Sequence, residues 1–303
     1  MRALIMSYSV TGTVRRVGER IADGLRSAGV DVVTHDLRDG RLPAVDGFDV
    51  VGIGSPVHYF RLAAPAVDAL RSFSSLDGRS AFIFVVHGTY RGFALNEARR
   101  KLRRLGAAEI GVFTCYGDDR FLGYTRRGYE FSPDHPTPEE LSAAEEFGRA
   151  LPEAHAAVQA GSPLALRPAD PWPGLVYAIE HVVLSPWLVR AVYGRIMRAD
   201  ASRCTKCGRC AHVCPAHNIT WEKGERPTWG RTCVGCFACA ETCPEEAVRT
   251  ALDWPLFRPF LAYNVRHAAR DPAIDRARVE MRRGRIVRLQ EGGTAQKGEH
   301  HED

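Results

Sequence analysis

The sequence contains no uninterrupted apolar run that is long enough to cross a membrane. Its most apolar stretch, Trp172–Val189, is broken by Glu180, His181 and Pro186, whereas a spanning helix needs roughly 20 apolar residues in succession. The first residues, Met1–Ser9, also lack the charged, apolar and small-residue sections of a signal peptide. We therefore expect a soluble cytoplasmic protein without a transmembrane segment, with a peripheral membrane contact as a secondary alternative.

Two common nucleotide-binding motifs are missing as well. The chain has neither the G-x-G-x-x-G of dinucleotide-binding domains nor the lysine of a Walker loop, so we expect no direct use of a nicotinamide cofactor. No nucleic-acid-binding motif accompanies the arginine-rich segment 276–288, and we expect no nucleic acid partner. The basic run 99–104 is interpreted as a solvated helix face, with docking of an acidic redox protein as the alternative.

Net charge and composition exclude no further class of globular protein. The 41 basic and 36 acidic residues give a net charge of only +5, and 45% of the residues are apolar, as in an ordinary globular protein. A chain of 303 residues is long for one core, so two domains are expected.

Cysteine is the residue type with the most informative distribution. Eight of the nine cysteines lie in one stretch and form two copies of the pattern C-x2-C-x2-C-x3-C-P, the second placed 29 positions after the first. The positions are Cys204, Cys207, Cys210 and Cys214, then Cys233, Cys236, Cys239 and Cys243. The regularity of this repeat indicates two related sites.

The spacing within each copy favours iron-sulfur clusters. The first three thiolates of a run converge on one cubane, and the fourth, offset by an extra residue, ligates the other cluster. We therefore expect one [4Fe-4S] cluster on Cys204, Cys207, Cys210 and Cys243, and a second on Cys233, Cys236, Cys239 and Cys214. The alternatives are disulfides, which a reducing cytosol disfavours, and zinc, whose C-x2-C pairs are separated by longer spacers. The stretch resembles a bacterial two-cluster ferredoxin.

The N-terminal half alternates apolar strands with amphipathic helices. We expect strands at 3–6, 31–34, 50–54, 81–86 and 110–115, and helices after Thr13 and at 66–73, 95–105 and 138–150. Such alternation predicts a doubly wound α/β domain with a parallel sheet, whose ligands bind at the carboxyl ends of the strands.

The loop after the first strand is suited to a phosphate. Its three hydroxyls and its glycine come directly before a helix, whose backbone N–H groups and dipole favour an anion. The sequence Tyr8-Ser9-Val10-Thr11-Gly12-Thr13 resembles the phosphate loop of flavodoxins. That resemblance implies FMN and a five-stranded sheet of order 2-1-3-4-5. Two positions depart from the family pattern, Thr13 and Val14, and Arg15 or Arg16 is expected to supply compensating charge.

The same resemblance implies that two further loops hold the flavin ring. Tyr59 and Tyr90 are the candidates for stacking on the ring, and the backbone of both loops is expected along its edge. The complete set of expected FMN-binding residues is Ser9, Val10, Thr11, Gly12, Thr13, Val14, Ser55, Pro56, Val57, His58, Tyr59, Gly88, Thr89, Tyr90 and Gly92. His58 and His87 are weak candidates for proton donation, with structural hydrogen bonding as the alternative. The aromatic insertion 117–136 is expected either to cover the flavin or to pin its own loop.

Together these features predict a member of the flavodoxin and ferredoxin fusion proteins. We expect a flavodoxin-like FMN domain at 1–160, a linker and helical packing segment at 161–198, an α+β two-cluster ferredoxin-like domain at 199–252, and a C-terminal wrap with a disordered tail at 253–303. The combination implies an FMN- and iron-sulfur-dependent oxidoreductase that relays electrons from a redox protein to a small acceptor. The alternative is a carrier without chemistry of its own that docks a partner redox enzyme.

Overall fold

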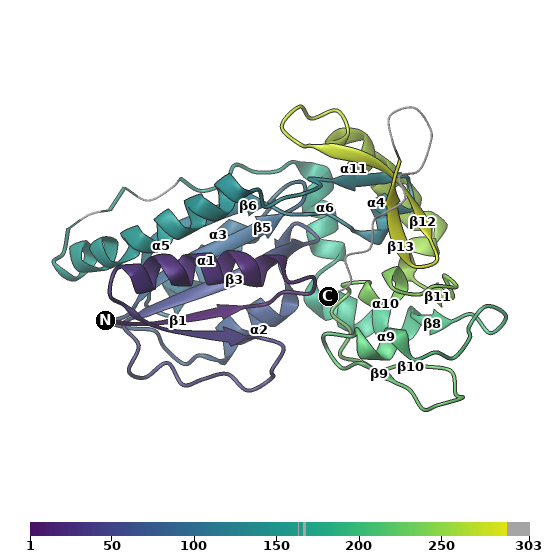
Figure 1. Cartoon of the computed structure of the whole chain (residues 1–303), viewed down its shortest axis with the longest axis horizontal. Helices are drawn as coiled ribbons and strands as arrows, with labels where there is room; N and C mark the ends of the chain where they lie inside the picture. The colour runs from purple at the N-terminus through teal and green to yellow at the C-terminus, as the bar shows by residue number, and fades with distance from the viewer. Residues whose placement is uncertain (163, 166–167, 290–303) are drawn as a thin grey trace. The chain divides into compact units, whose positions relative to one another are not determined.

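The computed structural model describes residues 1–162, 164–165 and 168–289. These residues form two compact units (Figure 1). Unit 1 comprises Met1–Gly117 and Asp134–Pro186, and unit 2 comprises Asp118–Pro133 and the described residues from Trp187 onward. The expected boundaries fell at 160 and 198, whereas the described residues from Gly161 to Pro186 belong to unit 1 and the insertion 118–133 belongs to unit 2. The expected disordered tail, 291–303, lies outside the described residues.

Unit 1 is built on a parallel sheet with the strand order β2-β1-β3-β5-β6. Its strands are β1 (Arg2–Ser7), β2 (Asp31–Asp36), β3 (Val50–His58), β5 (Ser80–His87) and β6 (Ala108–Tyr116). Counted along the chain, the parallel strands have the predicted order 2-1-3-4-5, which is that of flavodoxin-like sheets. One element was not expected: the short strand β4 (Arg61–Leu62) pairs antiparallel with the end of β3.

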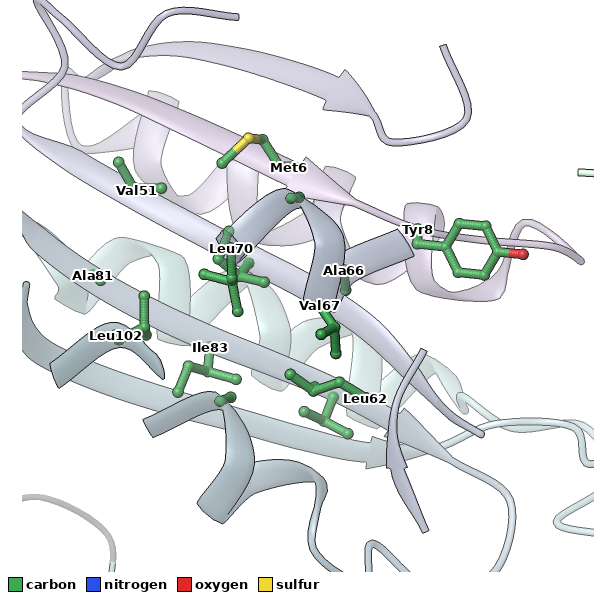
Figure 2. Close-up of a cluster of buried hydrophobic side chains, with 14 of the residues drawn as sticks. Met6, Tyr8, Val51, Leu62, Ala66, Val67, Leu70, Ala81, Ile83 and Leu102 are labelled. Atoms are coloured by element: carbon green, nitrogen blue, oxygen red, sulfur yellow. The ribbon is translucent and has the colours of Figure 1, made fainter. Parts of the chain in front are cut away.

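Helices cover both faces of this sheet, as predicted for a doubly wound domain. One face carries α2 (Ala64–Ser72) and α3 (Ala94–Arg104), and the other carries α1 (Thr13–Ser27) and α5 (Pro138–Gln159). Figure 2 shows the first of the two cores, in which side chains of α2 and α3 pack on those of β1, β3 and β5. The helix α6 (Leu175–Val183) completes unit 1.

Two glycines allow the backbones of α1 and α5 to come into direct contact. A Cβ on Gly24 would lie 2.0 Å from the carbonyl oxygen of Glu145, and a Cβ on Gly148 would lie 2.1 Å from that of Ile21. Neither backbone oxygen can move aside cheaply, so any larger residue would separate the helices. This pair of glycines therefore holds α1, whose N-terminus follows the predicted phosphate loop, tightly against the domain.

Unit 2 contains two short copies of the same supersecondary pattern around the cysteines. Each copy has a one-turn helix followed by a two-residue strand: α9 (Arg209–His212) with β9 (Ile219–Thr220), and α10 (Ala238–Glu241) with β11 (Val248–Arg249). Each element of the second copy begins 29 positions after its counterpart. The strand β10 (Thr228–Trp229) pairs with β9, and β8 (Arg198–Ala199) pairs with β11. The sequence repeat is thus a structural repeat.

The remainder of unit 2 joins two distant parts of the chain. The insertion supplies α4 (Leu122–Thr125) and β7 (Tyr129–Phe131), and β7 pairs with β12 (Arg276–Arg282), which in turn pairs with β13 (Arg285–Arg288). The short helix α7 (Pro186–Leu188) begins at the last residue of unit 1. The other elements of unit 2 are the π-helical turn η1 (Val189–Tyr193), α8 (Gly194–Ile196), the turns η2 (Ala251–Asp253) and η3 (Pro255–Phe257), and α11 (Arg258–Ala268). The arginine-rich segment 276–288 is therefore a hairpin, in which Arg288 pairs with buried Glu130 at 2.6 Å.

Within the described part of the chain, no single helix has the length and apolar composition to cross a bilayer. The two successive helical segments Leu175–Val183 and Pro186–Val192 meet that criterion only when they are taken together.

Candidate functional site

The eight repeated cysteines of unit 2 gather into two groups, and each group takes its fourth member from the other copy. Cys243 of the second run faces the three leading cysteines of the first, and Cys214 of the first run faces those of the second. The groups are therefore Cys204, Cys207, Cys210 and Cys243, and Cys233, Cys236, Cys239 and Cys214. This is the crossed arrangement that the spacing predicts.

The first group lines a recess in the surface of unit 2. All four of its cysteines contribute, together with apolar and small residues from both copies. The lining also includes Ala199, Gly208, Pro227, Pro244, Ala247 and Val248. A mostly apolar lining of this kind limits solvent around an iron-sulfur cluster and so tunes its potential.

The two copies repeat each other down to single backbone conformations. Lys206, Gly208 and His217 have φ of 59°, 76° and 46°. Gly235, Phe237 and Glu246, 29 positions later in each case, have φ of 69°, 58° and 47°. Four of these six left-handed residues carry a side chain, which opposes this conformation, and both copies nevertheless share it.

Burial opposes ionisation of the most deeply buried thiols and so raises their pKa. It raises the pKa of Cys236 to about 12 and that of Cys210 to about 11, and neighbouring thiolates of the same group add to both shifts. Without a cation these cysteines stay protonated at neutral pH, because clustered thiolates repel one another in a desolvated space. Iron would supply the missing positive charge, so the thiol donor set fits a metal-thiolate centre.

Within the described ranges, no three or more His, Cys, Asp or Glu side chains converge closely enough to hold a single metal ion. A cubane differs in that each cysteine binds a separate iron atom, so its four thiols surround a larger space.

In unit 1, the loop between β1 and α1 has the features of an anion site. Ser9 is 1% exposed, and its Oγ has no hydrogen-bond partner among the described residues. Gly12 adopts φ 87° and caps the N-terminus of α1, and the hydroxyls of Thr11 and Thr13 lie 3.0 Å apart. A buried hydroxyl without a partner is costly, and an anion at this helix N-terminus would satisfy it.

Ser55, which was grouped with the flavin-binding residues for its backbone, uses its side chain elsewhere. Its Oγ donates to the carbonyl of Pro56 at 2.8 Å and accepts the backbone N–H of Ala63 at 3.0 Å. The hydroxyl therefore closes the β3–β4 hairpin rather than facing a ligand.

The turn between β3 and β4 holds two aromatic residues in a strained conformation. Tyr59 and Phe60 have φ of 54° and 60° and are the two central residues of a hairpin in which His58 pairs with Arg61. Positive φ at both positions is the requirement of a type I′ turn, which glycine and asparagine meet with less strain. Phe60 is buried against Tyr177, with ring centroids 4.3 Å apart, whereas Tyr59 is only half-buried. Strain of this kind is typical of functional loops.

The second and third predicted flavin loops are in direct contact. A Cβ on Gly92 would lie 2.4 Å from the Cβ of Phe60, and the N–H of Phe93 donates to the carbonyl of Phe60 at 2.7 Å. Tyr90 packs on Tyr177 with ring centroids 5.7 Å apart. The first loop joins them where the N–H of Tyr8 donates to the carbonyl of Gly54. The structure therefore brings all three predicted loops together at the carboxyl edge of the sheet.

Burial keeps both histidines of this edge neutral. It lowers the pKa of His58 and of His87 to about 4 in each case. Nδ1 of His87 lies 3.0 Å from the carbonyl oxygen of Thr89. The imidazole ring packs on the ring of Tyr116, with the two ring centroids 4.6 Å apart. A neutral imidazole that is hydrogen-bonded to the backbone is consistent with the structural alternative for His87 rather than with proton donation.

One bracing residue of the site was not expected. Arg91 forms a bidentate salt bridge with Asp170, in which Nε donates to Oδ2 at 3.1 Å and Nη2 donates to Oδ1 at 3.0 Å. This salt bridge fixes the third loop to the segment before α6. The sequence offers no signal for this contact, because Asp170 lies in a proline-rich stretch that composition marks only as a linker.

Comparison with known proteins agrees with the cysteine groups. Residues 196–244 match the family model of the 4Fe-4S dicluster domain. The chain is 36% identical over 53 residues to an uncharacterized ferredoxin of Methanocaldococcus jannaschii, an alignment that covers 16% of this chain and 69% of that protein. It is 34% identical over 77 residues to NADH-quinone oxidoreductase subunit I of Pelobacter propionicus, covering 21% of this chain and 41% of the subunit. The chain thus spans about two fifths of that subunit.

Unit 1 is similar to flavodoxins. An archaeal flavodoxin aligns with 52% of this chain and 99% of its own length, at 19% identity and a TM-score of 0.42. Flavodoxin 1 of Bacillus cereus aligns with 50% of this chain and 98% of its own length, at 17% identity and a TM-score of 0.40. The strand order, rather than these modest scores, carries the flavodoxin-like assignment.

These findings define a chain that joins a ferredoxin-like segment of the 4Fe-4S dicluster type to a domain with a flavodoxin-like fold. Through its cysteine-rich segment the chain belongs to the ferredoxin family.

Proposed function

We propose that the chain relays single electrons between two [4Fe-4S] clusters and FMN, and that a small acceptor is reduced at the flavin. The ligands are Cys204, Cys207, Cys210 and Cys243 for one cluster, and Cys233, Cys236, Cys239 and Cys214 for the other. Each cluster exchanges one electron and a flavin exchanges one or two, so the pair of cofactors links one-electron donors to two-electron acceptors.

The crossed grouping of the cysteines is the observation that carries the proposal. Cys243 lines the same recess as Cys204, Cys207 and Cys210, although it is separated from them by more than thirty positions in the chain. Disulfides or two local zinc sites would need no such exchange between the copies.

The phosphate loop supports FMN as the second cofactor. The unpartnered Oγ of Ser9 and the αL conformation of Gly12 precede a 15-residue helix, whose positive end favours a phosphate. The loop has no glycine-rich fingerprint for a dinucleotide, so a monophosphate is the better fit.

The residues around the ring site position the flavin rather than move protons. Tyr59 lies in the strained turn and is available to stack on the flavin ring. Tyr90, the second stacking candidate, packs on the ring of Tyr177. Because His58 and His87 are neutral at physiological pH, neither carries an imidazolium proton that it could donate.

The proposal is tested on protein purified without oxygen. We expect about eight iron atoms, about eight sulfide ions and about one FMN per chain. The chemically reduced protein is then mixed with quinones, nitroaromatics and N-oxides, and with cytochrome c as a protein acceptor, while flavin and cluster absorbance are followed.

The results separate the enzyme from its alternatives. Reoxidation by a small acceptor faster than by oxygen or cytochrome c supports the reductase. Reoxidation by the protein acceptor alone supports a carrier that docks a redox partner. Bound zinc, or a lack of FMN in chains with intact clusters, contradicts the electron relay itself.

A further inference from the structure

The two cysteine groups of unit 2 have different neighbours at equivalent positions. The strand β9 recurs as β11 after 29 positions, so Ile219 corresponds to Val248. Val248 pairs with Ala199 on β8, whereas Ile219 pairs with Trp229 on β10. Ala199 lines the recess of the first group. By the repeat, Trp229 occupies the matching position beside the second group.

The indole of Trp229 carries a buried N–H that lacks an acceptor. Its Nε1 is buried and has no hydrogen-bond partner among the described residues. Burial raises the pKa of the Cys239 thiol and neighbouring thiolates add to the shift, but the side chain of Trp229 opposes both. This is the effect of an N–H that favours the charged form of the sulfur. A buried donor without an acceptor is costly, and a cluster-bound sulfur would satisfy it.

A second polar side chain marks the same difference between the groups. Asn218 and Ala247 are equivalent, and the backbone N–H of each donates to the fourth cysteine of its run. Oδ1 of Asn218 accepts the N–H and the hydroxyl of Thr232 at 2.7 and 2.9 Å, while its buried Nδ2 has no partner within the described part of the chain. Ala247 lines the first recess with a methyl group only. Side-chain N–H groups therefore accompany the second group where the first has alanines.

Acidic side chains also lie near the second group. Glu241 belongs to α10, within the second cysteine run. Burial raises the pKa of Glu241 to about 7, the carboxylates of Asp119 and Glu130 act in the same direction, and Arg120 opposes them. The equivalent residue of the first run is His212. Negative charge disfavours the addition of an electron to a cluster, so a compensating donor matters more at the second group than at the first.

We propose that Trp229 tunes the second cluster by donating its indole N–H to Sγ of Cys239, which stabilises the reduced form of that cluster and not of the first. The inference rests on the proposed function in that both clusters must be bound. On reduction the second cluster takes up one electron from the first cluster or from an added reductant, and no bond is broken. The added negative charge spreads onto the sulfurs, so the hydrogen bond is stronger in the reduced state. Trp229 acts through Cys239 and is a positioning residue.

The test compares the wild type with Trp229→Phe, which keeps an aromatic ring and removes the N–H. Both are titrated anaerobically with dithionite while low-temperature EPR follows the reduced clusters. Reduction of the second cluster should become about fivefold less favourable, which is about 40 mV for one electron, while the first cluster is unchanged. With Cys207→Ala and Cys243→Ala only the second cluster should remain, so the same shift in that background assigns it directly.

A matched control makes the same exchange elsewhere in unit 2. Trp254 is 44% exposed, and Trp254→Phe should leave the potentials of both clusters at their wild-type values. Iron and sulfide analysis verifies that every variant holds its clusters.

A further measurement needs no change at Trp229. The chain that retains only the second cluster is isotopically labelled at the indole nitrogens, and pulsed EPR of the reduced cluster should detect a coupled label. This measurement decides the matter if Trp229→Phe loses its second cluster. The proposal is overturned if Trp229→Phe leaves the second potential unchanged, if both potentials shift equally, or if no coupled nitrogen is found. Wild-type chains that bind no clusters would contradict the proposed function instead.

Discussion

The backbone N–H of Ala247 lies 3.2 Å from Sγ of Cys243. The same hydrogen bond recurs 29 positions earlier, where the N–H of Asn218 lies 3.3 Å from Sγ of Cys214. Cys214 and Cys243 are the fourth cysteines of their runs, and each belongs to the cysteine group of the other copy. In both cases the N–H donor is the residue four positions after the cysteine. N–H donors to a ligating sulfur stabilise its negative charge and raise the potential of the cluster.

Double cysteine variants test which thiols share a cluster. Cys207→Ala with Cys243→Ala removes two ligands of one cluster in the crossed arrangement, so about four iron atoms per chain should remain. Cys236→Ala with Cys243→Ala removes one ligand from each cluster and should leave far less iron. Iron and sulfide analysis of anaerobic preparations measures both. The reverse order of iron contents would mean that each run holds its own cluster.

Ser9 and Ser55 should respond differently to alanine. Ser9→Ala deletes a buried hydroxyl without a protein partner and should weaken FMN binding roughly 5- to 30-fold, which corresponds to about 1 to 2 kcal/mol. Ser55→Ala breaks two hydrogen bonds of the hairpin and should lower the free energy of unfolding by about 1 to 3 kcal/mol. Fluorescence titration with FMN and urea unfolding of the FMN-free protein provide the two readouts. Equal FMN affinity of wild type and Ser9→Ala would remove this hydroxyl from the phosphate site.

Replacing Tyr59 should improve stability at the expense of flavin binding. Asparagine tolerates the φ of 54° found at this position, so Tyr59→Asn should raise the free energy of unfolding of the FMN-free protein by about 1 kcal/mol. Loss of stacking should weaken FMN binding by about 0.5 to 1.5 kcal/mol. Tyr59→Phe keeps both the ring and the strain and should change neither quantity by much. A Tyr59→Asn variant that binds FMN normally would exclude Tyr59 from the ring site.

His87 should make unit 1 sensitive to acid. Its folded-state pKa of about 4 lies below the unfolded value of 6.5, so protons bind the unfolded chain preferentially and the free energy of unfolding falls as the pH drops from 6.5 towards 4. Between pH 6.5 and 5.0 the wild type should lose about 1.5 kcal/mol more than His87→Gln. Urea unfolding at both pH values measures this difference. Identical losses would show that His87 titrates normally.

Much of the architecture could be predicted because its signals are local. Apolar runs, intervening amphipathic segments and the cysteine spacing each depend on neighbours in the sequence, and they predicted the parallel doubly wound sheet and the paired cysteine sites. The strand order came from the resemblance of the phosphate loop to that of flavodoxins. The turn at Tyr59 and Phe60 could not be predicted in this way. Neither residue is the glycine or asparagine that marks a type I′ turn, and the strain is held by burial of Phe60 against Tyr177.

The place of the aromatic insertion also escaped prediction. Its strand β7 pairs with β12, about 150 positions further along the chain, and Glu130 finds its partner in Arg288. Pairing over such a distance leaves no periodic signal in either segment. Its aromatic residues were expected to cover a flavin or pin a loop, and Phe121 packs on Tyr124 and on Phe237, whose φ of 58° belongs to the second cysteine loop.

Electron transfer from the clusters to the flavin within one chain is the central claim, and rapid mixing tests it most directly. The oxidised protein is mixed anaerobically with a limiting one-electron donor, and cluster and flavin absorbance are followed separately. We predict that the clusters are reduced first and that the flavin follows at a rate independent of protein concentration. In Cys236→Ala with Cys243→Ala this flavin phase should disappear. Equally fast flavin reduction in that variant would contradict the relay.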